Sequence, residues 1–160
     1  MARTFSTSDG LVPVDFAHCG LDHTTAARVL FGSDPSHYDS AGYLAHIGVE
    51  LLLKSWLLQI LGQFEGVHNL MALYAELESK CGAPKLDAGQ LELLSTLDGY
   101  EQLRYPNPKQ PTEVGDGDWA RIEAFVGFVC NAMPQEIPLA LEQVVPGRKA
   151  GRVLMKKRHE

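Results

Sequence analysis

Four polar side chains recur at helical spacing within an otherwise apolar stretch. Tyr43, His46, Glu50 and Lys54 are three or four residues apart, so on a helix they would form one polar stripe. Two interpretations fit this pattern. The stripe is either a structural Glu50–Lys54 pair, worth about 0.2–0.5 kcal/mol, with His46 hydrogen-bonded beside it, or one wall of a groove that holds a phosphate or nucleotide. The sequence places no third ligand beside His46 and Glu50, so no metal site and no cofactor are predicted.

A second group of candidate residues surrounds position 105. Arg104 could supply a positive charge to a phosphate, opposite the polar stripe. An ion pair with an acidic neighbour is the structural alternative for Arg104. Prolines hold the Tyr105-Pro-Asn107-Pro segment extended, so Tyr105 and Asn107 are candidates for contact with a base or a partner. Trp119 lies at helical spacing with apolar residues and is interpreted as core.

The elements that position these residues are helices. Apolar periodicity predicts helices over residues 13–30, 35–61, 68–80, 87–105 and 118–133, and a short turn or helix over 137–145. The end signals are Asp34 before Pro35, Gly62 after the second helix, and a capping box of Asp87 and Gln90 at the start of the fourth. His68 and Asn69 are expected to cap the third helix, and Gly99 to loosen the fourth. No run of alternating residues predicts strands. The expected fold is all-α, an up-and-down bundle of about five helices over residues 13–145, with an N-terminal arm over 1–12 and a basic tail over 146–160.

Charge is distributed unevenly along the 160 residues. The formal net charge is −6, yet residues 1–147 hold eight Lys and Arg against nineteen Asp and Glu, a balance of −11. Six basic residues lie from Arg148 to Arg158. They could contact nucleic acid or an acidic partner, or they could form a solvated, disordered end. An acidic body repels phosphates at long range, so non-specific binding of long nucleic acids is not expected outside the tail.

Two further observations bear on the environment of the chain. Cys19, Cys81 and Cys130 have no metal-binding spacing and are interpreted as buried thiols in a reducing compartment. The apolar stretch over 43–61 is long enough to span a bilayer, but its charged residues would each cost about 2.5–3.5 kcal/mol at the centre of one. We therefore expect a buried helix, no membrane partner and a cytoplasmic location.

Three segments resemble the HEPN family in order and spacing. Ala41-Gly-Tyr-Leu-Ala-His-Ile-Gly-Val-Glu50-Leu-Leu-Leu-Lys54 is similar to the long second helix of HEPN domains, and Gly66-Val-His-Asn-Leu70 to the entry of their third helix. Leu97-Asp-x-Tyr100 with Leu103-Arg-Tyr-Pro-Asn107 resembles the aromatic-rich fourth helix, which ends in Arg-Tyr-Pro. The resemblance implies a helical bundle that usually forms homodimers. Family members include defence and toxin ribonucleases, partners of minimal nucleotidyltransferases, and inactive versions used for binding.

The chain departs from the ribonuclease pattern of this family. Active members carry an Arg followed, after four to six residues, by a His. Counting from Arg104 leads to Lys109, Gln110 and Pro111 instead. Arg152 and His159 satisfy the spacing but lie in the basic tail, where basic residues are dense, and the match is interpreted as chance.

Three hypotheses follow from this departure. The leading one is a non-catalytic binding module for a nucleotide, RNA or partner protein, in a bacterial defence or toxin–antitoxin-like setting. One alternative is a divergent metal-independent endoribonuclease with Arg104 as the candidate catalytic residue and Tyr105 or His46 as the proton-transfer group. The other is a structural partner of a nucleotidyltransferase-type enzyme.

Overall fold

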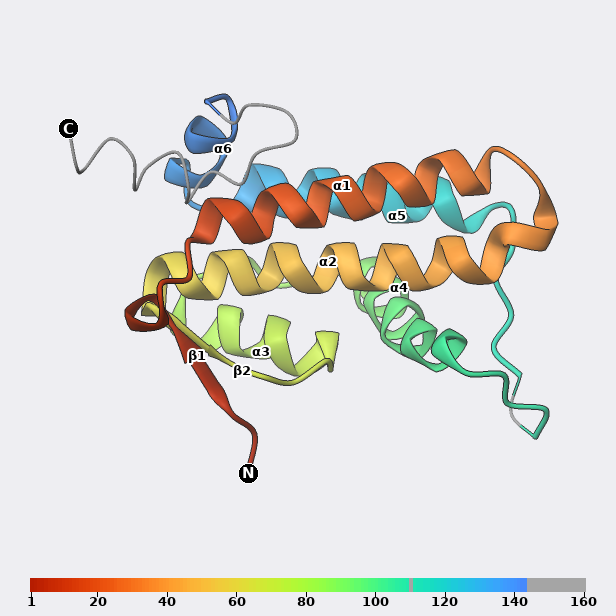
Figure 1. The fold of residues 1–160 in the computed structure, drawn as a ribbon, viewed down its shortest axis with the longest axis horizontal. Helices are drawn as coiled ribbons and strands as arrows, with labels where there is room; N and C mark the ends of the chain where they lie inside the picture. Colours follow the sequence, from red (N-terminus) through yellow and green to blue (C-terminus); the bar gives the residue numbers. More distant parts are fainter. Residues whose placement is uncertain (110, 144–160) are drawn as a thin grey trace.

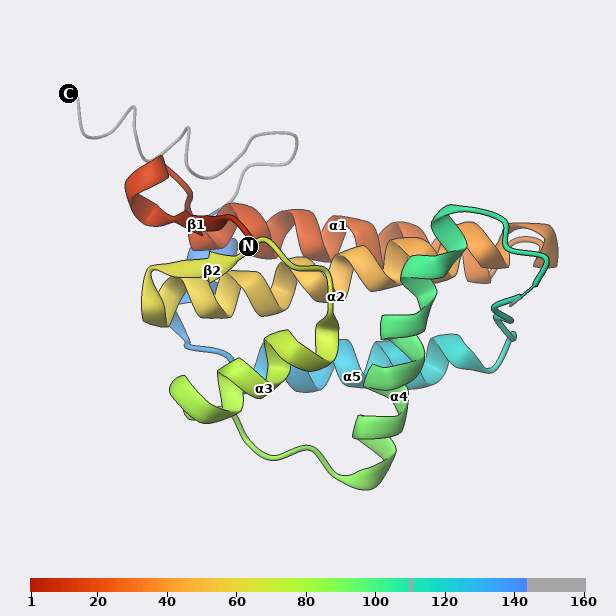
Figure 2. The same cartoon turned by 90° about the horizontal axis from the view of Figure 1, so that it is seen from below.

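The computed structural model describes residues 1–109 and 111–143. These form six α-helices, three short 3-10 helices and two short strands. The long helices α1 (Pro13–Phe31), α2 (Tyr38–Leu61) and α5 (Asp118–Ala132) run alongside one another, and the shorter α3 (Leu70–Lys80) and α4 (Ala88–Gly99) pack across them (Figure 1). Seen from below, α4 crosses α2 steeply (Figure 2). The all-α class predicted from the sequence is confirmed.

Helices α1 and α2 make the most extensive contact in the molecule because small residues let their backbones approach closely. A Cβ added at Gly48 would lie 2.5 Å from Thr24 Cγ2 and 2.9 Å from the Gly20 carbonyl oxygen. A Cβ at Gly20 would in turn lie 2.8 Å from the Gly48 carbonyl oxygen. The 3-10 helix η2 (Pro35–His37), capped by the Asp34 side chain, turns the chain between the two helices. Gly62 ends α2 with a positive φ of 71°, as the sequence predicts.

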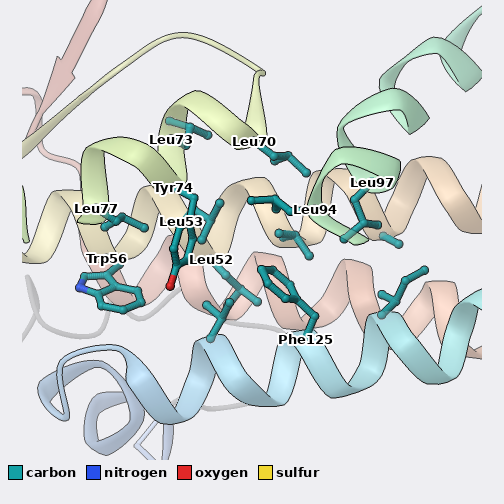
Figure 3. Close-up of a cluster of buried hydrophobic side chains, with 14 of the residues drawn as sticks. Leu52, Leu53, Trp56, Leu70, Leu73, Tyr74, Leu77, Leu94, Leu97 and Phe125 are labelled. Carbon is teal, nitrogen blue, oxygen red and sulfur yellow. The ribbon is translucent and has the colours of Figure 1, made fainter. Parts of the chain in front are cut away.

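Helix α2 is the centre of the hydrophobic core. Its apolar residues extend around most of the cylinder, and neighbouring helices bury them from several sides. The core around α2 includes Leu52, Leu53, Trp56, Leu70, Leu73, Tyr74, Leu77, Leu94, Leu97 and Phe125 (Figure 3). The segment Pro35–Leu61 is long and apolar enough to cross a membrane. However, 67% of the 18-residue stretch within it that meets the hydropathy criterion is buried inside the protein. Packing within a bundle therefore accounts for its composition.

The fourth helix predicted from the sequence divides into two elements. Helix α4 begins with the expected capping box of Asp87 and Gln90 and ends at Gly99. The chain then tightens into the 3-10 helix η3 (Tyr100–Arg104). The Tyr100 hydroxyl donates to Asp118 Oδ2 at 2.8 Å, which ties η3 to the start of α5. Trp119 packs its ring 5.7 Å from that of Phe31, in agreement with a core role.

A two-stranded antiparallel sheet corrects the expectation of a chain without strands. Strand β1 (Thr4–Ser6) pairs with β2 (Gln63–Glu65), with Phe5 opposite Phe64. The two rings stack at 5.6 Å, so the N-terminal segment covers the C-terminal end of α2. Each strand has only three residues, with one Phe between two polar residues, which is too short a pattern to be distinguished from a loop. The 3-10 helix η1 (Thr7–Asp9) lies between β1 and α1 in the chain.

The C-terminal part of the prediction is tested only in part. Helix α6 (Glu136–Leu141) confirms a short helix after α5 and packs near α1. Residues 142 and 143 form a turn after α6. Residues 144–145 of the expected segment and the basic tail, with Arg152 and His159, lie outside the described residues.

Candidate functional site

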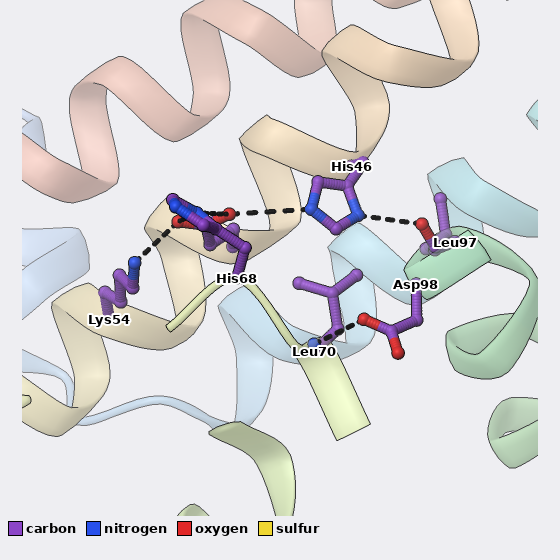
Figure 4. Close-up of polar contacts among 7 residues, drawn as sticks. His46, Lys54, His68, Leu70, Leu97 and Asp98 are labelled. Carbon is purple, nitrogen blue, oxygen red and sulfur yellow. Dashed lines mark hydrogen bonds and ion pairs between the residues drawn. The ribbon is translucent and has the colours of Figure 1, made fainter. Parts of the chain in front are cut away.

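A buried ionic cluster occupies the polar stripe of α2. Successive helical turns place His46, Glu50 and Lys54 on one face, with exposed fractions of 1%, 7% and 5%. Lys54 Nζ lies 2.6 Å from Glu50 Oε1, and His46 Nε2 lies 3.5 Å from Glu50 Oε2 (Figure 4). Lys54 also lies 5.2 Å from the centre of the Phe64 ring of β2. Burial on this scale favours the structural interpretation of the stripe over an open groove wall.

His68 joins this cluster from outside α2. The loop after β2 brings its Nδ1 to 3.1 Å from both Glu50 oxygens, while 58% of the His68 side chain stays exposed. The expectation that His68 caps α3 is wrong, because the cap is Asn69 alone, whose Oδ1 accepts from the Ala72 amide at 2.7 Å. The pairing of His68 with Glu50 depends on loop geometry, so the sequence contained no direct signal for it.

His46 connects the cluster to α4. Its Nδ1 lies 2.8 Å from the Leu97 carbonyl oxygen, which can only accept, so Nδ1 carries a proton. Its buried Nε2 has no hydrogen-bond partner within the described residues and faces the Glu50 carboxylate. Burial disfavours the charged ring, but the Glu50 carboxylate that faces Nε2, the hydrogen bond to Leu97 and the charge of Asp98 outweigh it and raise the pKa of His46.

Glu50 is held as a carboxylate in this setting. Burial alone would raise its pKa, but the nearby His46 ring, the hydrogen bonds from Lys54 and His68 and the charge of Lys54 lower the pKa of Glu50 to about 2. In the unfolded chain the ordinary value is 4.5. The stabilisation is therefore fully present above pH 4.5 and is lost as the pH falls towards 2.

Acid unfolding tests this assignment. The free energy of unfolding should fall between pH 5 and pH 2 by a Glu50 contribution on the order of 3 kcal/mol, since one pKa unit corresponds to about 1.4 kcal/mol. Urea unfolding of the unaltered chain and of Glu50→Gln at several pH values measures it. The difference between the two proteins should shrink as the pH falls, and a constant difference would contradict the assignment.

A separate, exposed group forms around η3 and the proline-rich segment that follows it. Tyr105 is 70% exposed, and the Arg104 guanidinium carbon lies 5.5 Å from the centre of its ring. Beside them is a pocket of about 440 Å³, lined by Asp39, Gln102, Leu103, Tyr105, Pro106, Asn107, Pro108, Pro111 and Thr112. Asn107 Oδ1 accepts from the Lys109 amide at 3.1 Å, which helps to hold the segment in shape.

The structure therefore divides the residues predicted to form one site into two groups. His46, Glu50 and Lys54 are buried together, whereas Arg104, Tyr105 and Asn107 belong to an exposed edge. Tyr43 is half-buried on α2. Sequence reasoning missed three polar residues of the pocket: Asp39 in the first turn of α2, Gln102 in η3 and Thr112 after the prolines. The pocket forms only where these three segments meet.

The remaining candidate residues for chemistry in the described part of the chain are metal-ligating side chains and cysteines. No group of three or more His, Cys, Asp or Glu side chains there could hold a metal ion. The three cysteines are free and half-buried, and burial raises the pKa of the Cys130 thiol.

The family assignment rests on this fold and on the match of the sequence. Residues 20–128 match the HEPN domain family, and the chain belongs to it. The match begins within α1 and ends within α5, so it includes both the buried cluster and the exposed edge at η3. Comparison with curated proteins and with solved structures gives no significant match.

Proposed function

We propose that this chain is a non-catalytic HEPN module that binds a nucleotide, free or at the end of a short single-stranded RNA, in the pocket beside Tyr105. The observation that carries the proposal is the exposed Tyr105 ring with the Arg104 guanidinium next to it, at the edge of a pocket that contains a few polar side chains. The pocket volume of about 440 Å³ lies within the range of small-molecule sites, about 300–1,000 Å³.

The groups at the pocket match the parts of a nucleotide. An exposed tyrosine ring offers a surface for stacking a base, which is worth about 1–3 kcal/mol. The Asp39 carboxylate can accept from base N–H groups, and the Gln102 amide can donate to base oxygens or nitrogens. Arg104 supplies a cation for the phosphate. The negative balance of residues 1–147 favours a ligand with few phosphates over a long polyanion.

We propose that the chain is non-catalytic because it departs from the Arg…His ribonuclease motif of the family. The positions after Arg104 that would hold a histidine hold Lys109, Gln110 and Pro111. His46 is 1% exposed, so it cannot reach a phosphodiester in solvent. Homodimerisation, a protein partner, the defence setting and the cytoplasmic location stay predictions.

Binding measurements test the proposal. Isothermal titration of the purified full chain with AMP, GMP, CMP, UMP and pentanucleotide RNAs should detect a nucleotide that binds. Tyr105→Ala should then weaken binding about tenfold or more, because lost stacking of at least about 1.4 kcal/mol is a factor of ten. Arg104→Ala should weaken binding of the nucleotide more than of the matching nucleoside. No binding by any of these ligands would contradict the proposal.

A matched control removes a positive charge elsewhere. Lys85 is exposed in the connection between α3 and α4, and Lys85→Ala changes the net charge by the same amount as Arg104→Ala. Its affinity should remain within about twofold of the unaltered chain. Equal losses in the two variants would mean that Arg104 acts only through the net charge.

A ribonuclease activity is the second candidate function, and the position of one histidine supports it. His37 is exposed at the end of η2, two residues before Asp39 of the pocket. A histidine there could carry a proton during cleavage at a 2′-hydroxyl. Incubation with structured and single-stranded RNAs decides between the two functions. Robust cleavage that both His37→Ala and Arg104→Ala abolish would overturn the non-catalytic proposal.

A further inference from the structure

One charged side chain lines the pocket beside Tyr105. Of the described residues around this pocket, only Asp39 carries a charge, and the other polar side chains are the neutral Gln102, Asn107 and Thr112. Asp39 is exposed, and its carboxylate has no ion-pair or hydrogen-bond partner in the described part of the chain. Both of its oxygens can therefore accept hydrogen bonds from a ligand.

The first turns of α2 bring this carboxylate to η3. Gly42 follows Asp39 by three residues, so the two share one face of the helix. A Cβ added at Gly42 would lie 2.8 Å from Leu103 Cδ1 of η3 and 3.0 Å from Val114 Cγ2. This face of α2 is therefore in close contact with η3 and with the segment after the prolines. Asp39 stands one turn earlier on the same face, where it lines the pocket together with Leu103.

The other parts of a bound nucleotide have neighbours of their own. In the proposed binding mode the base stacks on Tyr105 and the phosphate meets Arg104, the preceding residue in the chain. The ribose joins the base to the phosphate and therefore lies between these two side chains. Asp39 belongs to a different element, α2, and its charge repels a phosphate. The edge of the base is therefore the group that Asp39 can bind.

Guanine is the base that offers two neighbouring donors to a carboxylate. Its N1–H and 2-amino N–H groups lie side by side, and an ionised carboxylate has two oxygens that only accept. The corresponding edge of adenine or cytosine has one amino donor beside a ring nitrogen that accepts. Uracil has one N–H between two oxygens. Each of these bases would turn a lone pair towards the carboxylate, whereas Gln102 both donates and accepts and so does not discriminate.

We propose that the pocket beside Tyr105 selects guanine nucleotides, and that Asp39 determines this specificity by accepting from the N1–H and 2-amino groups of the base. The inference rests on the proposed function and names its ligand class. The ligand carries few phosphates, as a mononucleotide or as the terminal residue of a short RNA, because residues 1–147 are acidic.

Isothermal titration of the unaltered full chain with nucleotide analogues tests the contact. GMP should bind about tenfold or more tightly than AMP, CMP or UMP, because these bases leave the carboxylate incompletely paired. Inosine monophosphate, which lacks only the 2-amino group, should bind about fivefold or more weakly than GMP. Equal binding of GMP and inosine monophosphate overturns the proposal. A larger loss with dGMP than with inosine monophosphate also overturns it, since that result would place Asp39 at the ribose.

Asp39→Asn is a test in which net charge and recognition predict opposite results. Removal of a negative charge near a phosphate should by itself strengthen the binding of every nucleotide. Loss of one acceptor should instead weaken GMP binding about tenfold or more, because the new amide N–H faces a donor of the base. AMP binding should not weaken, since asparagine can pair with adenine through one donor and one acceptor. Tighter binding of GMP, or equal weakening of GMP and AMP, overturns the proposal.

A matched control removes the same charge at a distance from the pocket. Glu123 is exposed on α5 and is not among the residues that line the pocket. Glu123→Gln should keep the preference for GMP over AMP within about twofold of the unaltered chain, because it changes only the net charge. Circular dichroism checks that both variants keep their helices. If Asp39→Asn does not fold, the comparison of GMP with inosine monophosphate on the unaltered chain still decides.

Short RNAs distinguish the two sources of the base. Pentanucleotides of equal composition that carry guanosine at the 5′ end, at the 3′ end or in the centre are compared with GMP. Tightest binding of one terminal guanosine identifies an RNA end, and tightest binding of GMP identifies the free nucleotide. If nucleotides bind without a preference for guanine, the specificity fails and the proposed function stands. If no nucleotide binds, both fail.

Discussion

Replacing Glu50 by alanine is expected to lower the free energy of unfolding by about 3–5 kcal/mol at pH 7, the usual cost of breaking a buried ion pair from one side. The Lys54 ammonium would remain 5% exposed, without the carboxylate that now lies 2.6 Å from it. His68 and His46 would lose the same partner. Urea unfolding followed by circular dichroism measures the change.

An exposed pair of the same spacing serves as the control. Glu76 and Lys80 lie four residues apart on α3 with 3.0 Å between Nζ and Oε1, and the Lys80 side chain is 60% exposed. Glu76→Ala should cost no more than about 1 kcal/mol, because water solvates the remaining lysine. The double change Glu50→Ala with Lys54→Met should cost less than Glu50→Ala alone, since no buried charge is left unpaired. Similar losses for Glu50→Ala and Glu76→Ala would contradict the buried cluster.

Gly48→Ala is expected to destabilise the protein by about 1–3 kcal/mol, even though alanine is the better helix former. The new Cβ would lie 2.5 Å from Thr24 Cγ2 and 2.9 Å from a backbone oxygen of Gly20. A backbone atom in a packed helix cannot move aside as the end of a flexible side chain can, so α1 and α2 would have to separate. Thermal and urea unfolding measure the loss.

The control for this change is a glycine in another helix. Gly127 lies within α5 and is exposed, and among the described residues no atom beyond its chain neighbours and the nearby backbone of α5 lies within 4 Å of an added Cβ. Gly127→Ala should therefore stabilise the protein by about 0.5–1 kcal/mol through helix propensity alone. If Gly48→Ala were also stabilising, the close approach of α1 and α2 would be wrong.

The sequence predicted the helices well because their signals are local. Asp34 before Pro35, the Asp87–Gln90 capping box and Gly62 at the end of α2 all act within one turn of the residues concerned. The nearly continuous apolar surface of the stretch 43–61 identified the central helix for the same reason, since burial on several sides requires it. The three segments that resemble the HEPN family lie within the region that matches it.

The elements that the sequence did not reveal depend on contacts between distant residues. Strands β1 and β2 are nearly sixty residues apart and too short to show a period, so only their pairing defines them. His68 stands in a loop, and nothing near it in the chain indicates Glu50 as its partner.

By itself, the sequence determined the helical class, the family and the polar stripe on α2, because each depends on the types and spacing of residues that are close in the sequence. Only the tertiary structure decided that His46, Glu50 and Lys54 are buried while Arg104 and Tyr105 are exposed. The physical reason is that helical spacing fixes which side chains share a face, but the packing of α3, α4 and the loop of His68 determines whether that face meets protein or water. The pocket beside Tyr105 arose in the same way, from the meeting of α2 with η3 and the prolines that follow it.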